Sequence, residues 1–277
     1  MIVEPAQRDE FLALMQEHYG EAMSPPEFDW WFDRNPAGPR ILNVARDAGG
    51  TALGVLAMSP ARFENGLVAF AVHAVTTPAA RGRGVFSELE LHNEQQAAAA
   101  GAHWALGFTN PMAGPILVGK LGWEDVTQLR IWVRPKRLRL RRRGELREPT
   151  EISTRPRELP GHHIARDEAY LHWRYAASPR RYAQAGDTVV TYAVWHGMSS
   201  AVVCEHGRGL NRAVRAVDAD IAVAIVNPGE ERSFLAAGFV PTPRRIRFIG
   251  KRLREDAPPL PRDRRAWYLT LGDLDFF

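Results

Sequence analysis

The stretch from residue 72 to residue 123 constrains the fold more than any other part of this 277-residue chain. An apolar segment runs into a basic glycine loop, RGRG at 81–84, which opens directly onto a segment typical of a helix, 85–100. A second apolar segment, 104–109, follows. A glycine turn between a strand and a helix exposes backbone N–H groups and the positive end of the helix dipole, and together these bind phosphate groups. The stretch therefore predicts a strand–loop–helix–strand unit with an anion site at its loop.

The composition is that of a globular protein, with 45% apolar and 25% charged residues. No apolar run reaches 18 residues, and the first ten residues lack the pattern of a signal peptide, so we expect neither a membrane span nor a leader. The single cysteine, Cys204, excludes an intrachain disulfide and a cysteine-based metal cluster. We expect a cytoplasmic protein without a bound metal.

The net charge of +4 is concentrated in one place, since residues 134–143 contain seven basic residues and no acidic ones. The favoured interpretation is a solvated linker or strand edge, and the alternative is a surface for nucleic acid or membrane. No aromatic residue interrupts the run to stack on bases, which disfavours nucleic acid. We therefore expect neither partner, and a monomer or a homodimer.

The first half of the chain alternates helical and strand patterns. Apolar periodicity and turn residues predict a mixed α/β fold with a central sheet and helices on both of its faces. The predicted strands are 2–4, 41–47, 52–58, 67–76, 104–109 and 128–133, and the predicted helices are 9–19, 25–34, 85–100 and 112–120.

Three short motifs of the first half return in the second half. The motif at 31–36 is echoed at 173–179, Asn-Pro at 110–111 is echoed at 227–228, and Leu-Gly-Trp at 121–123 is echoed by Ala-Gly-Phe at 237–239. This spacing favours duplication of a whole domain over a solenoid. The second copy is shorter where the first has its glycine loop and helix, so we expect it to keep the scaffold and lose the anion site. The predicted domains are 1–134 and 162–277, joined by a basic, proline-rich linker at 135–161.

The loop and the motifs after it resemble the GNAT superfamily of acyl-CoA N-acyltransferases, and in particular a bacterial subgroup with a degenerate second GNAT-like half. The family motif is Gln/Arg-x-x-Gly-x-Gly/Ala, which the RGRG loop fits, although Phe86 replaces the last small residue. The resemblance implies the acyl-CoA N-acyltransferase fold in two tandem copies, with acetyl-CoA as the acyl donor. By resemblance, the residues that bind it are Val75, Thr76, Arg81, Gly82, Arg83, Gly84, Val85, Phe86 and Asn110.

The resemblance leaves the catalytic residues open. GNAT enzymes often carry a tyrosine general acid three residues before the Leu of Leu-Gly-Trp, and here that position is Val118, which has no proton to transfer. His73 is the candidate base, Thr77 is a candidate hydrogen-bond donor to a carbonyl, and Asn110 is a candidate substrate contact. The alternatives are a core histidine, a strand-end threonine and a plain Asn-Pro turn.

Two further groups have competing interpretations. Trp30 and Trp31 are expected in the core rather than in an acceptor pocket. Residues 267–271 alternate like a strand that completes a sheet. Asp273 and Asp275 after them are either part of a solvated tail or acidic groups that attract a cationic amine.

The function implied by the resemblance is an N-acetyltransferase that moves an acyl group directly to an amine of a small molecule or peptide, with the second half shaping the acceptor site. One alternative is a hydroxyl acceptor. The non-enzymatic alternative, favoured by Val118, is an acyl-CoA-binding sensor or interaction module.

Overall fold

The chain forms two compact units in the computed structural model, which describes residues 1–20, 23–136, 144–147 and 149–274. Unit 1 comprises Met1–Val126 and Phe248–Arg262, and unit 2 comprises Thr127–Arg247 and Asp263–Phe277. The division differs from the predicted one, which placed the boundary after residue 134 and left all of 162–277 in the second half. Residues 248–262 return to unit 1 because the last strand passes from one unit into the other.

Unit 1 is built on a mixed sheet, as the sequence predicted. β4 and β5 pair in parallel, while β1 to β4 pair with their neighbours in antiparallel fashion. The strand order is β1 (Ile2–Pro5), β2 (Ile41–Arg46), β3 (Ala52–Phe63), β4 (Gly66–Thr76), β5 (Trp104–Thr109) and the end of β13 (Val240–Arg252).

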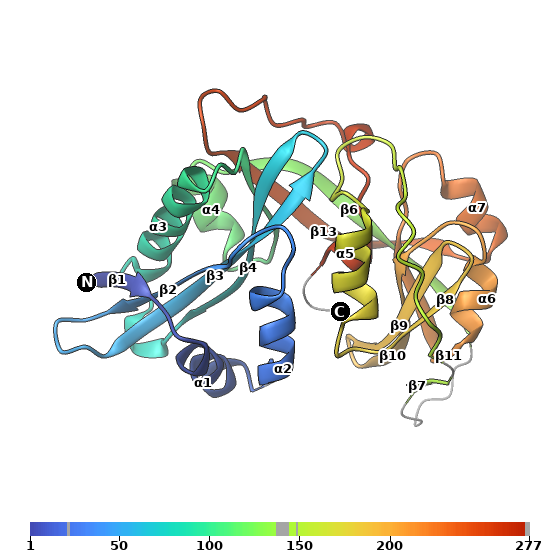
Figure 1. Cartoon of the computed structure of the whole chain (residues 1–277), viewed down its shortest axis with the longest axis horizontal. Coiled ribbons are helices and arrows are strands. Elements are labelled where there is room, and N and C mark those ends of the chain that lie inside the picture. The colour runs from blue at the N-terminus through green and yellow to red at the C-terminus, as the bar shows by residue number, and fades with distance from the viewer. Residues whose placement is uncertain (21–22, 137–143, 148, 275–277) are drawn as a thin grey trace. The chain divides into compact units, whose positions relative to one another are not determined.

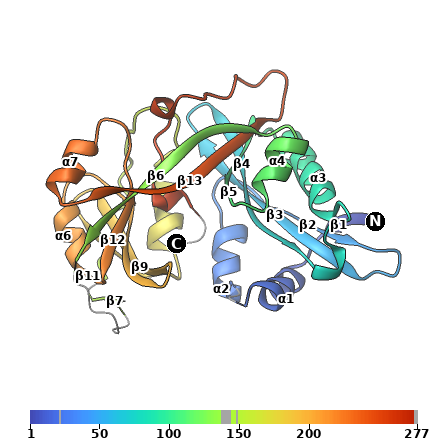
Figure 2. The same cartoon turned by 180° about the vertical axis from the view of Figure 1, so that it is seen from behind.

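Helices cover both faces of the unit 1 sheet (Figures 1 and 2). On one face α3 (Val85–Ala99) and α4 (Gly114–Lys120) pack against an apolar cluster that includes Ala74 of β4. On the other face lie α1 (Arg8–Tyr19) and α2 (Pro25–Phe28). The ring of Phe11 in α1 contacts the ring of His73, the strand neighbour of Ala74. No helix within the described residues is long and apolar enough to cross a membrane.

The helix predicted at 25–34 is regular only as far as Phe28. It begins at Ser24, whose side chain forms a capping box with Glu27, and continues as a π-helix over Asp29–Asp33. In unit 2, α5 (Glu168–Leu171) likewise continues as a π-helix over His172–Ala176. Trp30 and Trp31 are buried, which confirms the predicted core role.

Unit 2 is also built on a mixed sheet with helices. β10 and β12 pair in parallel, with α6 (Leu210–Arg215) between them and α7 (Glu231–Ala236) after β12. The strand order is the beginning of β13, β6 (Glu124–Pro135), β12 (Ile221–Ile225), β10 (Met198–Glu205), β9 (Thr188–Trp195) and β8 (Tyr182–Ala185).

The described part of the predicted linker packs onto unit 2. β7 (Glu145–Leu146) pairs with β11 (Val217–Asp218), and the Ser153 N–H donates to the side chain of Gln184. At the start of the basic run, Lys136 Nζ donates to the carbonyl oxygen of Val214 at 2.8 Å. Residues 137–143, which form the rest of that run, lie outside the described residues.

Candidate acyl-CoA site

The parallel strands β4 and β5 separate where the predicted site begins. Their pairing runs from Val68 opposite Trp104 to Ala71 opposite Gly107 and then stops, although both strands continue. At this point β4 contains a bulge, since its register with β3 shifts between Ala71 and Ala74. A bulge bends a strand and increases its twist. The end of β4 therefore leaves β5 and remains paired with β3 alone.

The free side of β4 carries the backbone groups of alternate residues. Thr77 donates its N–H to the carbonyl oxygen of Leu53 in β3 at 3.0 Å. Because strand N–H groups alternate in direction, the N–H of Val75 also faces β3, and that of Thr76 faces the side on which β5 has separated. Of these two predicted contacts, only Thr76 has an N–H on the open side.

The loop that follows β4 is held close to the sheet. Gly54 of β3 makes this possible, because a Cβ there would lie 2.6 Å from the carbonyl oxygen of Val75 and 3.1 Å from a methyl group of Val85. Gly84 precedes α3 as its N-cap residue with φ of +80°. A side chain at this φ is strained, so the sequence has glycine where the backbone turns into the helix.

The loop presents donors and positive charge. Two of its N–H groups, those of Arg81 and Arg83, donate to carbonyl oxygens of the preceding 3₁₀ turn. Within the described residues, no hydrogen bond uses the N–H groups of Gly82, Gly84, Val85 or Phe86, and neither arginine has a carboxylate partner. The guanidinium groups are exposed, and nothing lies within 4 Å of a Cβ built on Gly82 or Gly84. This arrangement suits a doubly charged group such as a pyrophosphate.

His73 lies on the opposite face of β4 from α3. Its ring is partly exposed and contacts Phe11 and Phe32, with centroids 6.0 and 6.2 Å away. Thr77 begins the 3₁₀ turn Pro78–Ala80 and accepts the Ala80 N–H through its carbonyl oxygen. His73 therefore lies in the open half of β4, and Thr77 directly follows that strand.

Asn110 forms its hydrogen bonds mainly with the residues that directly follow it. Its Oδ1 accepts the N–H groups of Met112 and Ala113, both at 2.9 Å, and its carbonyl oxygen accepts that of Gly114. The side chain thus satisfies N–H groups at the start of α4. Its exposed amide nitrogen is the part that remains to donate to a ligand.

Two carboxylates on α3 were not anticipated from the sequence. Glu94 is buried and accepts hydrogen bonds from Trp123 Nε1 at 2.7 Å and from the ammonium group of Lys251. Glu90, one turn earlier, is 1% exposed, and neither carboxylate oxygen has a hydrogen-bond partner within the described residues. Burial, with a smaller contribution from Glu94, raises the pKa of Glu90 to about 8. Glutamates on an amphipathic helix are usually solvated, so no sequence signal distinguished these two.

Val118 is partly buried on α4 against the same apolar cluster as Phe86. Neither side chain can donate a proton. Where the family motif has a tyrosine, this chain therefore has an apolar side chain in apolar surroundings.

Asp273 is not available to a cationic acceptor. It is 7% exposed, its Oδ1 lies 2.6 Å from Arg166 Nη2, and its Oδ2 accepts the Thr270 N–H. Both interpretations of Asp273 are wrong: it is not part of a solvated tail, because it is buried, and it does not attract an amine, because it is already paired with a buried arginine. Residues 267–271 form no strand of either sheet, so the predicted strand is also wrong, and Asp275 lies outside the described residues.

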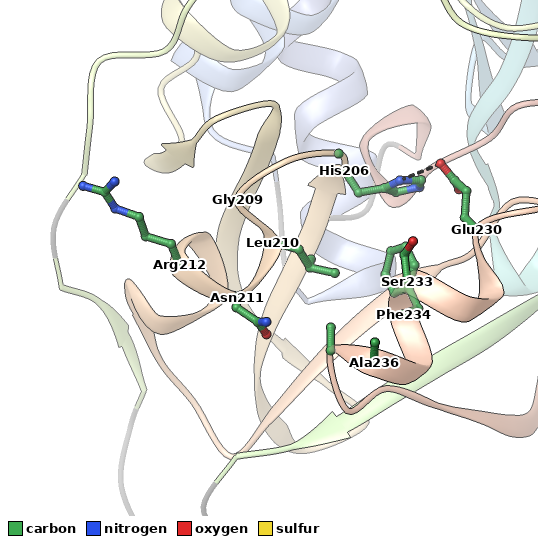
Figure 3. Close-up of a pocket in the computed structure, with 11 residues that line it drawn as sticks. His206, Gly209, Leu210, Asn211, Arg212, Glu230, Ser233, Phe234 and Ala236 are labelled. Carbon is green, nitrogen blue, oxygen red and sulfur yellow. Dashed lines mark ion pairs between the residues drawn. The ribbon is translucent and has the colours of Figure 1, made fainter.

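The corresponding region of unit 2 contains a cleft. Gly209 precedes α6 with φ of +90°, as Gly84 precedes α3. A cleft of about 560 Å³ lies between α6 and α7, with His206 and Phe234 in its wall (Figure 3). The second glycine loop therefore also lies between a strand and a helix, although α6 has six residues where α3 has 15.

The fold is that of GCN5-related N-acetyltransferases. The chain is 12% identical to a GCN5-related N-acetyltransferase from Anabaena variabilis, with a TM-score of 0.58 over 91% of this chain and 73% of that one. It is 14% identical to one from Kribbella flavida, with a TM-score of 0.55 over 91% and 72%. A probable N-acyltransferase from Enterococcus faecalis is 10% identical, with a TM-score of 0.58 over 91% and 72%.

No protein-family model matches the chain, and no curated protein sequence matches it. The likeness thus rests on the arrangement of elements.

Proposed function

We propose that the chain is an acyltransferase that uses acetyl-CoA or a related acyl-CoA as its donor and a primary amine as its acceptor. The observation that carries the proposal is the open end of β4 beside a glycine loop whose donors have no internal acceptors. N–H groups at the start of a helix have no partner within the helix, and where they are exposed beside a glycine loop they are available to a phosphate. The loop fits a pyrophosphate, and the single strand edge fits a ligand arm with amide groups.

Different groups of the chain are proposed to bind different parts of the acyl-CoA. The N–H groups of Gly82, Gly84, Val85 and Phe86 and the side chains of Arg81 and Arg83 would hold the pyrophosphate. The Thr76 N–H and the Asn110 amide would pair with the arm. The bound acyl-CoA supplies the thioester, and its binding places that group beside the open half of β4, so that the acceptor attacks within one complex.

His73 is the residue proposed to take the proton from the attacking amine. It lies on the strand that would hold the thioester, and its ring packs against the rings of Phe11 and Phe32. Thr77 is proposed to hydrogen-bond the carbonyl oxygen. The thiolate leaves without a protein acid at Val118, since no side chain there carries a proton.

Calorimetry with acetyl-CoA tests the donor site. We expect one site per chain, and a loss of affinity of about 100-fold or more in Gly84→Glu, because a carboxylate placed over the loop repels the phosphates and blocks the approach to the N–H groups. Gly197→Glu is the matched control: Gly197 also has a positive φ, +77°, and open space at its Cβ position, but it lies in the β9–β10 turn. Unchanged affinity in Gly84→Glu would contradict the proposal.

Release of free thiol from acetyl-CoA with a panel of amines tests turnover. His73→Gln is expected to lower kcat strongly while leaving acetyl-CoA affinity unchanged. Tight binding without release for any acceptor would instead support the sensor function, which the apolar environment of Val118 favours.

A further inference from the structure

The parallel strands of unit 2 separate as those of unit 1 do. β10 and β12 pair from Ser200 opposite Ile221 to Val202 opposite Val223, and the last residues of both strands are not paired with each other. In unit 1 the equivalent opening between β4 and β5 leads to the predicted acyl-CoA site. The unpaired ends of β10 and β12 therefore require other contacts.

The C-terminal segment, Trp267–Leu274, contacts the ends of both strands. Beyond β12, Asn227 Oδ1 accepts the N–H of Leu269 at 2.9 Å. At β10, Gly272 lies so close that a Cβ on it would be 2.5 Å from the carbonyl oxygen of Cys204. Every residue of the segment is buried. The segment therefore reaches from one open strand end to the other.

Buried arginines hold this segment along its length. Arg174 Nε donates to the carbonyl oxygen of Gly272 at 3.0 Å, and its Nη2 donates to that of Leu274 at 3.3 Å. Arg166 joins Asp273 to Glu205 at the end of β10, at 2.6 and 3.0 Å. Bonds from charged donors are stronger than neutral ones, and these arginines are 1% exposed. The segment is bound by the same kind of contacts that hold a peptide ligand.

The polar groups around the cleft are also satisfied internally. Asn227 Oδ1 accepts from Leu269 and from Arg264 Nη2, so the amide nitrogen of Asn227 points at His206 Nε2, 3.3 Å away. Nε2 is then the acceptor, and Nδ1 carries the proton that Glu230 accepts at 3.2 Å (Figure 3). His206 and Asn227 are thus engaged by the chain itself, unlike the loop donors of unit 1.

We propose that the C-terminal segment is a permanent internal ligand of unit 2, occupying the opening that corresponds to the acyl-CoA arm position of unit 1. Each chain therefore holds one acyl-CoA, and unit 2 serves as a scaffold closed by its own terminus. The correspondence to acyl-CoA rests on the proposed function, whereas the occupancy of unit 2 does not.

Cutting the chain tests the occupancy. A specific protease site is inserted between Pro259 and Leu260, outside the helices and strands. After cleavage of the folded protein, we expect the C-terminal fragment to remain bound through size-exclusion chromatography.

In the cleaved Asn227→Ala variant, the fragment should dissociate about tenfold faster or more, because the buried N–H of Leu269 loses its acceptor. Asn110→Ala, the matched control in unit 1, should leave dissociation unchanged. Loss of the fragment from the cleaved wild type with an unchanged circular dichroism spectrum would overturn the proposal.

If Asn227→Ala does not fold, hydrogen exchange of the intact wild type tests the occupancy of unit 2 instead. The Leu269 amide should be protected to the same degree as the amides of Val202 and Val223, and exchange at the unprotected rate would overturn the proposal.

The stoichiometry of acetyl-CoA binding to the intact wild type tests the closure. We expect one acetyl-CoA per chain because the second opening is filled, and two per chain would overturn the proposal. Failure of the wild type to bind acetyl-CoA would instead defeat the proposed function and leave fragment retention intact.

Discussion

The ends of β4 and β10 show how the same arrangement can be left open or be filled. At β4 the loop has glycines with open space above them, and its arginines have no carboxylate partner among the described residues. At β10 a Cβ on Gly209 would overlap the carbonyl oxygen of Ala185, and Arg208 pairs with Asp187 at 3.0 Å. The two loops therefore differ in the space above their glycines and in the pairing of their arginines, and the proposed ligand site belongs to the loop that is open and unpaired.

The two regions also treat buried charge differently. In unit 2, Glu205 and Asp273 are each paired with the buried guanidinium group of Arg166. In unit 1, Lys251 pairs with Glu94, and Glu90 has no hydrogen-bond partner among the described residues. We expect the filled region at the end of β10 to stabilise the folded chain. We expect the open region at the end of β4 to stabilise it less, because its groups are left available for binding.

The largest effect is expected from Arg166→Met. It leaves the buried Asp273 without its cation and leaves Glu205 with only a longer ion pair to Arg157, and it should lower the free energy of unfolding by about 3–5 kcal/mol. Lys251→Met in unit 1 is the matched change, and there we expect a loss of about 2 kcal/mol, because the ammonium group is partly exposed and Glu94 keeps the hydrogen bond from Trp123 Nε1. Urea denaturation of both variants measures the two values. Equal losses would remove the distinction between the filled and the open region.

A smaller difference is expected between the two asparagines that follow the parallel strands. Asn227→Ala removes partners from Leu269, Arg264 and His206 and should cost about 3 kcal/mol. Asn110→Ala removes only the acceptor at the start of α4 and should cost about 1 kcal/mol. Thermal unfolding ranks the two variants. A costlier Asn110→Ala would reverse the assignment of filled and open regions.

A gain in stability that depends on pH, opposite in sign to the losses above, is expected from Glu90→Gln. The pKa of Glu90 rises from its ordinary value of 4.5 to about 8 in the folded chain, so the folded state loses stability as the pH rises between these values. The variant lacks this titration. Relative to the wild type, its free energy of unfolding should therefore rise by about 3 kcal/mol between pH 5 and pH 8. Glu88→Gln on the exposed side of α3 is the control, and a pH-independent difference for Glu90→Gln would contradict the buried charge.

Much of unit 1 was predictable because its elements are specified locally. The apolar run ending at Thr76, the loop at 81–84 and the helix ended near Gly101 have periodicity and turn residues that act within a few positions. The parallel pair β4–β5 and the helices on both faces follow from that order. The π-helix after Phe28 was not predictable, because its hydrogen-bond pattern departs from the regular helix that the same residues favour.

The sequence by itself determined the class of fold, the place of the loop and the absence of a proton donor at Val118. These depend on residue identity and spacing along the chain. Only the tertiary structure decided that Glu90 is buried and that Asp273 pairs with Arg166 instead of facing a substrate. These outcomes depend on which distant groups meet, such as Arg166 and Asp273, and on how much water remains around them.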